Sequence, residues 1–207
     1  MIRIGLLSDT HAYWDEKYLE YFEPCDEIWH AGDIGSVEVA ERLAAFRPFR
    51  AVYGNIDGQA IRKLYPQVNR FTVDDTEVLI KHIGGYPGKY DPSIIGSLMT
   101  RPPKLFISGH SHILKVKYDK TLDMLHINPG AAGMSGFHKV RTLVRFVIER
   151  GRLRTWKLSS WQINNFSYYF CHLGFLSDLC TQFMNNEDEH EGNYSCRWQC
   201  HSPLSAF

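Results

Sequence analysis

The stretch LSDTH, residues 7–11, ends the first apolar run of the chain and puts Asp9 two residues before His11. An aspartate after a strand is a common turn former and helix cap, so this stretch alone indicates only a turn. In α/β proteins, however, ligands bind outside the carboxyl ends of the strands. The stretch becomes informative if other strands also end in side chains of this kind.

The first third of the chain alternates strands with helices. Continuous apolar runs predict strands, and apolar residues at helical spacing predict helices, one of which has Ser36 as its N-cap. The predicted strands are Ile2–Leu7, Glu27–His30 and Phe49–Tyr53, and the predicted helices are Asp15–Phe22, Ser36–Phe46 and Gly58–Leu64. This alternation favours parallel strands with helices packed on the sheet.

The next part of the chain is richer in strands and has one predicted helix, Pro92–Thr100. Turn residues at 118–121 and 149–152 predict two hairpins. The predicted strands are Phe71–Val73, Val78–His82, Leu105–Ser108, Leu114–Tyr118, Met124–Ile127, Thr142–Glu149 and Leu153–Leu158. We expect one α/β domain of two stacked sheets flanked by helices over residues 1–158, and an atypical tail over residues 159–207 that is not part of the catalytic domain.

Polar side chains follow five of the predicted strands. They are Asp9 with His11, then Asp33, then Asn55, then His82, and finally His110 with His112. Each has an ordinary explanation: Asp33 and Asn55 follow glycines and suit turns, and a lone histidine such as His82 is commonly a satisfied core residue. These explanations would have to hold separately at five strand ends, so we interpret the set as one site.

The types of ligand decide the metal chemistry. Imidazole and carboxylate without thiolate suit manganese, iron, nickel or zinc rather than a structural cysteine–zinc site. Seven ligands are too many for one ion and suit two ions that share a carboxylate. Two-metal sites clamp the attacking and leaving oxygens of an in-line displacement. The sequence therefore predicts two divalent ions, manganese first among them, and the hydrolysis of a phosphate ester.

The order Asp-x-His, Gly-Asp, Gly-Asn, a lone His and Gly-His-Ser-His resembles the calcineurin-like metallophosphoesterases, above all their small bacterial and archaeal phosphodiesterases. The resemblance runs from Ile2 to about Leu158 and includes Asn128-Pro129-Gly130 after a late strand. It implies a four-layer sandwich of two mixed β-sheets flanked by helices, with a dinuclear site at the strand ends. The implied activity is phosphodiester hydrolysis through a hydroxide held between the metals, whose pKa the ions lower.

The resemblance also implies a role for each site residue. By position, Asp9, His11 and His112 would hold one ion, Asn55, His82 and His110 the other, and Asp33 would bridge both. The residues expected to carry catalysis are Asp33, Asn55 and His82. Ser8 and Thr10 are expected to orient the ligands from behind.

Two positions depart from the family pattern. Many members follow Gly-Asn with a histidine, the general acid for the leaving group, where this chain has Ile56. Isoleucine cannot donate a proton, so we expect hydrolysis to be best with good leaving groups. The next residue, Asp57, is interpreted as a helix cap or as a weak substitute that acts through water. Ala131-Ala132-Gly133 stands where serine is frequent, which costs one hydrogen-bonding group at most.

A glycine-rich loop, residues 84–90, follows His82. Such a loop is by default a flexible connection. Its position beside the predicted metals makes Lys89 and Tyr86 candidates for contact with the substrate.

Two other functions remain open. One branch of the same fold is the scaffold subunit of a membrane-coat complex and hydrolyses little, and Ile56 lends this alternative some weight. Against it, a scaffold has no physical need to keep seven ligands together. A nuclease would share the chemistry but prefer a basic groove that a neutral chain does not indicate.

Composition sets the remaining limits. The chain has 23 basic and 23 acidic residues among 207, which argues against a protein built mainly to bind nucleic acid or an anionic membrane. No apolar run approaches a membrane span, and we expect a cytoplasmic protein acting on a small phosphodiester, with homo-oligomers left open. Four of the five cysteines lie in the tail, and a zinc cluster of Cys196, Cys200, His190 and His201 lacks a second well-formed pair.

Overall fold

The computed structural model describes residues 1–162 and 169–171, all of which belong to the unit that spans residues 1–176. Its first elements follow the expected alternation. They are β1 (Ile2–Leu7), α1 (Lys17–Phe22), β2 (Glu27–His30), α2 (Val37–Phe46), β3 (Phe49–Ala51) and α3 (Gln59–Leu64). The Ser36 side chain accepts a hydrogen bond from the Val39 N–H, which confirms the predicted N-cap of α2.

Strands dominate the next part of the described chain, as predicted. The elements are β4 (Val68–Val73), β5 (Thr76–Lys81), β6 (Gly85–Tyr86), β7 (Lys89–Tyr90), α4 (Pro92–Thr100), β8 (Leu105–Ile107), β9 (Leu114–Asp119), β10 (Met124–Pro129), β11 (Val140–Glu149), β12 (Arg152–Gln162) and β13 (Tyr169–Cys171).

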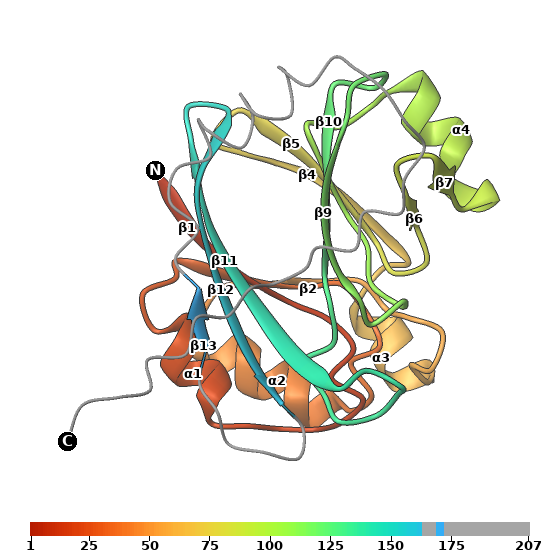
Figure 1. The fold of residues 1–207 in the computed structure, drawn as a ribbon. Coiled ribbons are helices and arrows are strands. Elements are labelled where there is room, and N and C mark those ends of the chain that lie inside the picture. Colours follow the sequence, from red (N-terminus) through yellow and green to blue (C-terminus); the bar gives the residue numbers. More distant parts are fainter. Residues whose placement is uncertain (163–168, 172–207) are drawn as a thin grey trace. The chain divides into compact units, whose positions relative to one another are not determined.

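Two mixed sheets carry the fold (Figure 1). The first has the order β13-β12-β11-β1-β2-β3, and the second has the order β4-β5-β8-β10-β9. Strands β1, β2 and β3 are parallel in the first sheet, and β5, β8 and β10 are parallel in the second. Parallel neighbours end at the same edge, so each sheet collects three strand-to-loop junctions at one edge.

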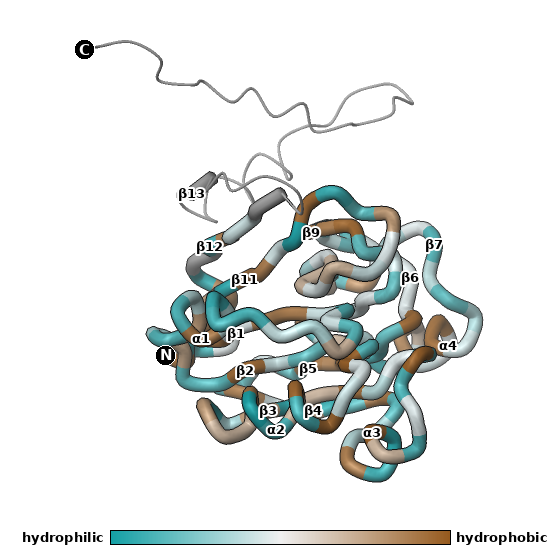
Figure 2. Tube along the Cα trace, turned by 90° about the horizontal axis from the view of Figure 1, so that it is seen from below, coloured by the Kyte–Doolittle hydropathy of each residue, from teal (hydrophilic) through white to brown (hydrophobic). Residues whose placement is uncertain are grey.

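The main core lies between the two sheets. Ile4, Leu6 and Val144 of the first sheet pack with Ile80 and Ile107 of the second, and all five are buried. Figure 2 shows hydrophobic residues recurring along β2, β5 and β11. The burial of these strands on both faces explains their continuous apolar runs.

Helices cover the outer face of each sheet. One cluster joins residues of α1, α2 and α3 to the first sheet, and another joins α4 to the second; their helical members are Phe22, Leu43, Ile61, Ile94 and Leu98. The order of layers is therefore helix, sheet, sheet, helix, and the predicted four-layer α/β sandwich is confirmed.

Some boundaries differ from the prediction. The strand expected to end at Leu158 runs on to Gln162, because Ser159 and Ser160 continue the antiparallel pairing with Leu143 and Thr142 of β11. Segments β6 and β7 form a small hairpin in what was expected to be a loop.

The remaining expectations for the tail fall on residues 163–168 and 172–207, outside the described part of the chain. They include the zinc cluster. The described residues of the expected tail, 159–162 and 169–171, belong to β12 and β13 of the first sheet. Among the described helices, none has the length and apolar content that crossing a bilayer requires.

Candidate metal centre

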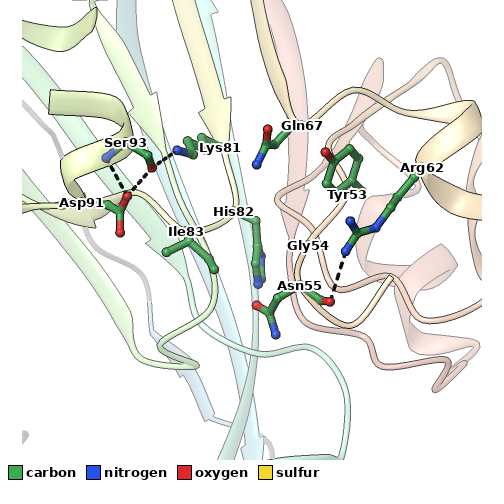
Figure 3. A pocket seen from close by; sticks show the side chains of 10 residues that line it. All are labelled: Tyr53, Gly54, Asn55, Arg62, Gln67, Lys81, His82, Ile83, Asp91 and Ser93. Carbon is green, nitrogen blue, oxygen red and sulfur yellow. Dashed lines mark hydrogen bonds between the residues drawn. The ribbon is translucent and has the colours of Figure 1, made fainter. Parts of the chain in front are cut away.

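The strand-to-loop junctions of the two sheets bring the predicted ligands together. Potential ligand atoms form two groups, each with its atoms within 4.8 Å of one another: Asp9, His11 and His112 in one, and Asp33, His82 and His110 in the other. Asn55 lines the pocket beside His82, and Figure 3 shows its side chain next to the imidazole. All seven residues thus come from junctions that the sequence predicted, and their metal and catalytic roles stay predictions.

Asp33 belongs to the second group and also reaches the first. Its Oδ2 is 3.2 Å from His82 Nε2 and 3.7 Å from His11 Nε2, so one carboxylate reaches both clusters. Asp9 Oδ1 is 3.1 Å from His112 Nε2 and 3.9 Å from His82 Nε2. Both carboxylates thus lie close to imidazole nitrogens of both groups, as a carboxylate shared by two cations would.

The backbone at the site adopts an uncommon conformation. Five of the seven predicted ligands have φ in the left-handed region: Asp9 at 56°, His11 at 49°, Asp33 at 55°, His110 at 68° and His112 at 56°. Residues other than glycine rarely adopt it, although aspartate and histidine do so more readily than most. Each such residue turns the chain sharply after a strand and directs a side chain into the gap between the sheets' edges.

Two buried ligand atoms have no hydrogen-bond partner. His82 Nδ1 donates to the Ala31 carbonyl at 2.8 Å, so the neutral ring presents a lone pair at Nε2, and that atom is unpartnered. Asp9 Oδ2 accepts the His110 N–H at 3.2 Å, whereas its Oδ1 is unpartnered. Buried polar groups are normally satisfied, so lone pairs that converge without a donor fit a cation.

The charges at the site are consistent with this conclusion. Burial opposes ionisation of Asp33, but contact with His82 and the N–H of Ile56 lowers its pKa overall. Burial also opposes protonation of His82, yet contact with Asp33 and the charges of Asp9 and Asp33 raise its pKa. The negative charges of Asp9 and Asp33 thus favour a positive charge at this site.

His138, which the sequence analysis missed, fixes the orientation of His112. His138 Nε2 lies 3.1 Å from the Gly133 carbonyl and is therefore the donor there. Burial lowers the pKa of His138, so its ring is neutral and its Nδ1 is an acceptor, 3.1 Å from His112 Nδ1. His112 must then donate from Nδ1, which leaves the lone pair of its Nε2 facing Asp9 Oδ1.

Asp57 is a structural carboxylate, and its interpretation as a helix cap is wrong. The N-cap position of α3 is Gly58, and Asp57 makes no cap there. Its side chain is buried and accepts from the N–H groups of Ile34, Gly35 and Gly54 at 3.2, 2.7 and 2.8 Å. Asp57 therefore ties the loop of Asp33 to the loop of Asn55.

Asn128 and Gly54 fix the positions of the loops that carry His110 and Asp33. Asn128 Nδ2 donates to the Gly109 carbonyl at 2.7 Å, beside His110, while its Oδ1 accepts from Gly130. A Cβ on Gly54 would lie 2.0 Å from Asp33 Oδ1, so only glycine permits this approach. The Gly-Asn and Asn-Pro-Gly patterns thus act through backbone geometry.

Ser8 and Thr10 support the loops and do not touch the ligand atoms. Thr10 Oγ1 donates to the Ile34 carbonyl at 2.9 Å and lies 3.0 Å from His30 Nε2. Ser8 Oγ donates to the Gly32 carbonyl at 3.4 Å. Burial lowers the pKa of His30 to about 4, so this histidine is a neutral part of the scaffold.

The predicted substrate contacts lie in the small hairpin. Tyr86 has the Lys115 ammonium 3.5 Å from its ring centroid, and Lys89 is exposed. Neither residue lines the pocket beside His82. Their role in binding stays a prediction.

Comparison with known proteins places this geometry in a family. The calcineurin-like phosphoesterase superfamily domain matches residues 2–151. A probable metallophosphoesterase of Methanothermobacter thermautotrophicus is 27% identical over 133 residues, which cover 62% of this chain and 76% of that protein.

Solved structures share the fold at low sequence identity. An archaeal phosphodiesterase is 22% identical with a TM-score of 0.61, over 78% of this chain and all of that chain. Vps29 of Chaetomium thermophilum is 13% identical with a TM-score of 0.67, over 83% and 95% of the two chains. Vps29 of Entamoeba histolytica in complex with Zn²⁺ is 14% identical with a TM-score of 0.64, over 83% and 98%.

Proposed function

Because the chain belongs to the calcineurin-like phosphoesterase superfamily, we propose that it is a phosphodiesterase that uses two divalent metal ions, with manganese as the preferred metal. The observation that carries the proposal is the convergence of buried, unpartnered lone pairs on either side of Asp33. Mixed imidazole and carboxylate ligands without thiolate favour manganese, with nickel, iron or zinc as alternatives.

Each residue has a defined task in this proposal. Asp9, His11 and His112 would hold one ion, Asn55, His82 and His110 would hold the other, and Asp33 would be shared by both. Two such ions, when bound, lower the pKa of water between them and withdraw charge from the phosphoryl oxygens. Ala31 and His138 fix the ring tautomers of His82 and His112, so that both present Nε2 to the ions.

Ile56 determines the class of phosphodiester in this proposal. Its backbone N–H donates to Asp33 Oδ1 at 3.1 Å, but its side chain cannot protonate a leaving oxygen. Leaving groups that depart as stable anions, such as aryl oxides, therefore suit this chain best.

The test is hydrolysis of bis(4-nitrophenyl) phosphate by protein reconstituted with manganese, beside 4-nitrophenyl phosphate as the monoester. We expect the diester to be the better substrate and activity to disappear on chelation and return with manganese. Asp26→Asn, which alters an exposed carboxylate paired with Arg3, is a matched control and should leave the rate unchanged. No hydrolysis of either ester by metal-loaded protein would refute the proposal.

A second candidate is a protein-interaction scaffold with little hydrolytic activity. It is favoured by the absence of a proton donor at Ile56 and by the likeness in fold to Vps29. Metal loading without hydrolysis of any aryl phosphoester would select this candidate.

A further inference from the structure

A pocket of about 290 Å³ adjoins the candidate metal centre (Figure 3). Its inner wall includes His82 and Asn55, so a substituent on a phosphorus atom bound at the metals could extend into it. The other walls include Tyr53, Ile83 and two cationic side chains. The proposed hydrolysis assigns no role to these four side chains.

Arg62 supplies the first cation of this pocket. Its Nε donates to the Asp57 carbonyl at 2.7 Å and its Nη2 to the Asn55 carbonyl at 3.3 Å. Its guanidinium carbon lies 4.7 Å from the centroid of the Tyr53 ring. These partners are neutral, and no carboxylate of the described residues forms an ion pair with Arg62. The guanidinium is thus held in place with its charge uncompensated.

Lys81 supplies the second cation and is unusual because its side chain is buried, at 6% exposure. Its Nζ donates to the Ser93 hydroxyl, which in turn donates to Asp91 Oδ1. An ammonium has three donors, and buried lysines are ordinarily paired directly with a carboxylate. Within the described chain no carboxylate lies within ion-pair distance of Lys81, and Asp91 is one hydroxyl group away.

The charge balance of the pocket is therefore positive. Arg62 and Lys81 contribute two positive charges against the single negative charge of Asp91. The Asp91 carboxylate is also engaged as the N-cap of α4, where it accepts the Ser93 N–H at 2.9 Å. An anion in the pocket would face donors that are already oriented and only partly neutralised.

We propose that this pocket binds the substituent that stays on phosphorus when the leaving group of the phosphodiester departs. This substituent is a short alcohol whose far end carries a second anionic group, a carboxylate or a phosphate. This inference rests on the proposed phosphodiesterase function. Pockets for drug-sized ligands measure roughly 300–1,000 Å³, so this smaller one suits a chain of a few carbons with its charged end. Tyr53 and Ile83 would contact the carbons, while Lys81 and Arg62 would contact the anion.

The test compares two diesters with the same leaving group. They are 4-nitrophenyl 3-carboxypropyl phosphate and its methyl ester, which differ in one negative charge. In both, an oxygen from water bonds to phosphorus and the bond to nitrophenolate breaks, so the chemistry is identical. We expect kcat/KM to be about tenfold to a hundredfold higher for the carboxylate, as for a hydrogen bond to a charged group. A third diester, with a terminal phosphate in place of the carboxylate, shows which of the two anionic groups the pocket prefers.

Two substitutions should move this preference in opposite directions. Lys81→Met removes the charge at nearly the same length and should remove most of the difference in kcat/KM between the carboxylate and its methyl ester. Asp91→Asn keeps a good N-cap but removes the opposing charge, so it should increase the preference. Lys104→Met, at an exposed ion pair with Asp123, is the matched control and should change nothing. Opposite shifts are not expected from a general loss of structure.

Binding of the product separates this inference from the proposed function. Calorimetric titration of manganese-loaded protein with 3-carboxypropyl phosphate, beside its methyl ester, needs no turnover. Tighter binding of the carboxylate that Lys81→Met abolishes supports the pocket even if hydrolysis fails. Equal binding and equal rates for the two compounds in the wild-type protein would overturn the inference, and hydrolysis of both diesters would then leave the phosphodiesterase proposal standing.

Discussion

Loops at the two ends of the sheets use the same rare backbone conformation for different purposes. At the carboxyl ends of β1, β2 and β8, left-handed residues such as Asp9 and Asp33 are buried and are proposed metal ligands. At the hairpin turns of the described chain, Asp74, Asp123 and Arg150 are also left-handed. There Asp74 Oδ2 accepts the Arg150 N–H at 2.8 Å, and Asp123 pairs with Lys104.

The difference shows what marks a functional site in this fold. A positive φ at an aspartate is compatible with an ordinary exposed turn. At the hairpin end the carboxylates of Asp74 and Asp123 have N–H or ammonium partners, whereas Asp9 Oδ1 and His82 Nε2 are buried without a hydrogen-bond partner. Thr76 Oγ1, beside the turn of Asp74, is also buried without a partner, so a single such atom does not mark a site. The convergence of unpartnered lone pairs with further ligand atoms separates the candidate metal centre from the turns.

The largest expected effect compares an aspartate at each end. Asp33→Asn removes the charge that bridges the two groups and should lower aryl diesterase activity by more than about 100-fold, since even supporting residues of metal sites contribute 10–100-fold. Asp74→Asn at the hairpin end should leave the rate unchanged. Steady-state rates at saturating manganese measure both. Near-normal activity of Asp33→Asn would show that the metal assignment is wrong.

A smaller effect is expected at His138. His138→Phe removes the acceptor for His112 Nδ1 at a similar ring size, so the tautomer of His112 is no longer fixed. We expect manganese affinity to fall by about 10–100-fold. Equilibrium titration of the metal measures this without catalysis. His138→Gln keeps a weaker acceptor, so its manganese affinity should lie between those of the wild-type protein and His138→Phe. Equal affinity in all three proteins would show that His138 does not orient His112.

Asp57 should affect folding more than ion binding. Asp57→Asn leaves at least one of three buried N–H groups without an acceptor, which costs about 1–3 kcal/mol of unfolding free energy. Asp26→Asn at an exposed ion pair should cost at most about 1 kcal/mol. Denaturant unfolding of both variants makes the comparison. Equal, small losses would mean that the two loops do not depend on Asp57.

The smallest effect is expected for Ile56→His. The Ile56 side chain is 45% exposed, so nothing around it would orient an imidazole. General acid catalysis contributes about 10²–10⁴-fold when the acid is positioned, and we expect a gain below about tenfold here, greater for alkyl than for aryl esters. The measurement is the slope of rate against leaving-group pKa. An equally shallow slope in both proteins would show that another group already supplies the proton.

The sequence predicted the part of the site that follows from strand ends. Asp9, Asp33 and His82 each stand just beyond an apolar run, and parallel strands bring such positions to one edge. The four layers followed from the alternation of strands and helices. Patterns in a short stretch of sequence are enough to predict these features, because each feature depends on one helix or strand and on where it ends.

The supporting residues could not be predicted in the same way. His138 stands in a loop and meets His112 across 26 residues of sequence, and Asp57 meets Ile34 across 23. No spacing rule identifies such pairs, because the path of the loops decides them. Lys81 did carry a detectable feature, since a lysine ending an apolar strand is out of place unless its charge has a use.

Metal stoichiometry tests the central claim most directly. Metal-free protein would be dialysed to equilibrium against manganese and its bound metal counted by elemental analysis, beside Asp33→Asn. The account predicts about two ions per wild-type chain, as in other two-metal sites, and fewer in the variant that lacks the bridging charge. One ion or none per wild-type chain at saturating manganese would contradict it.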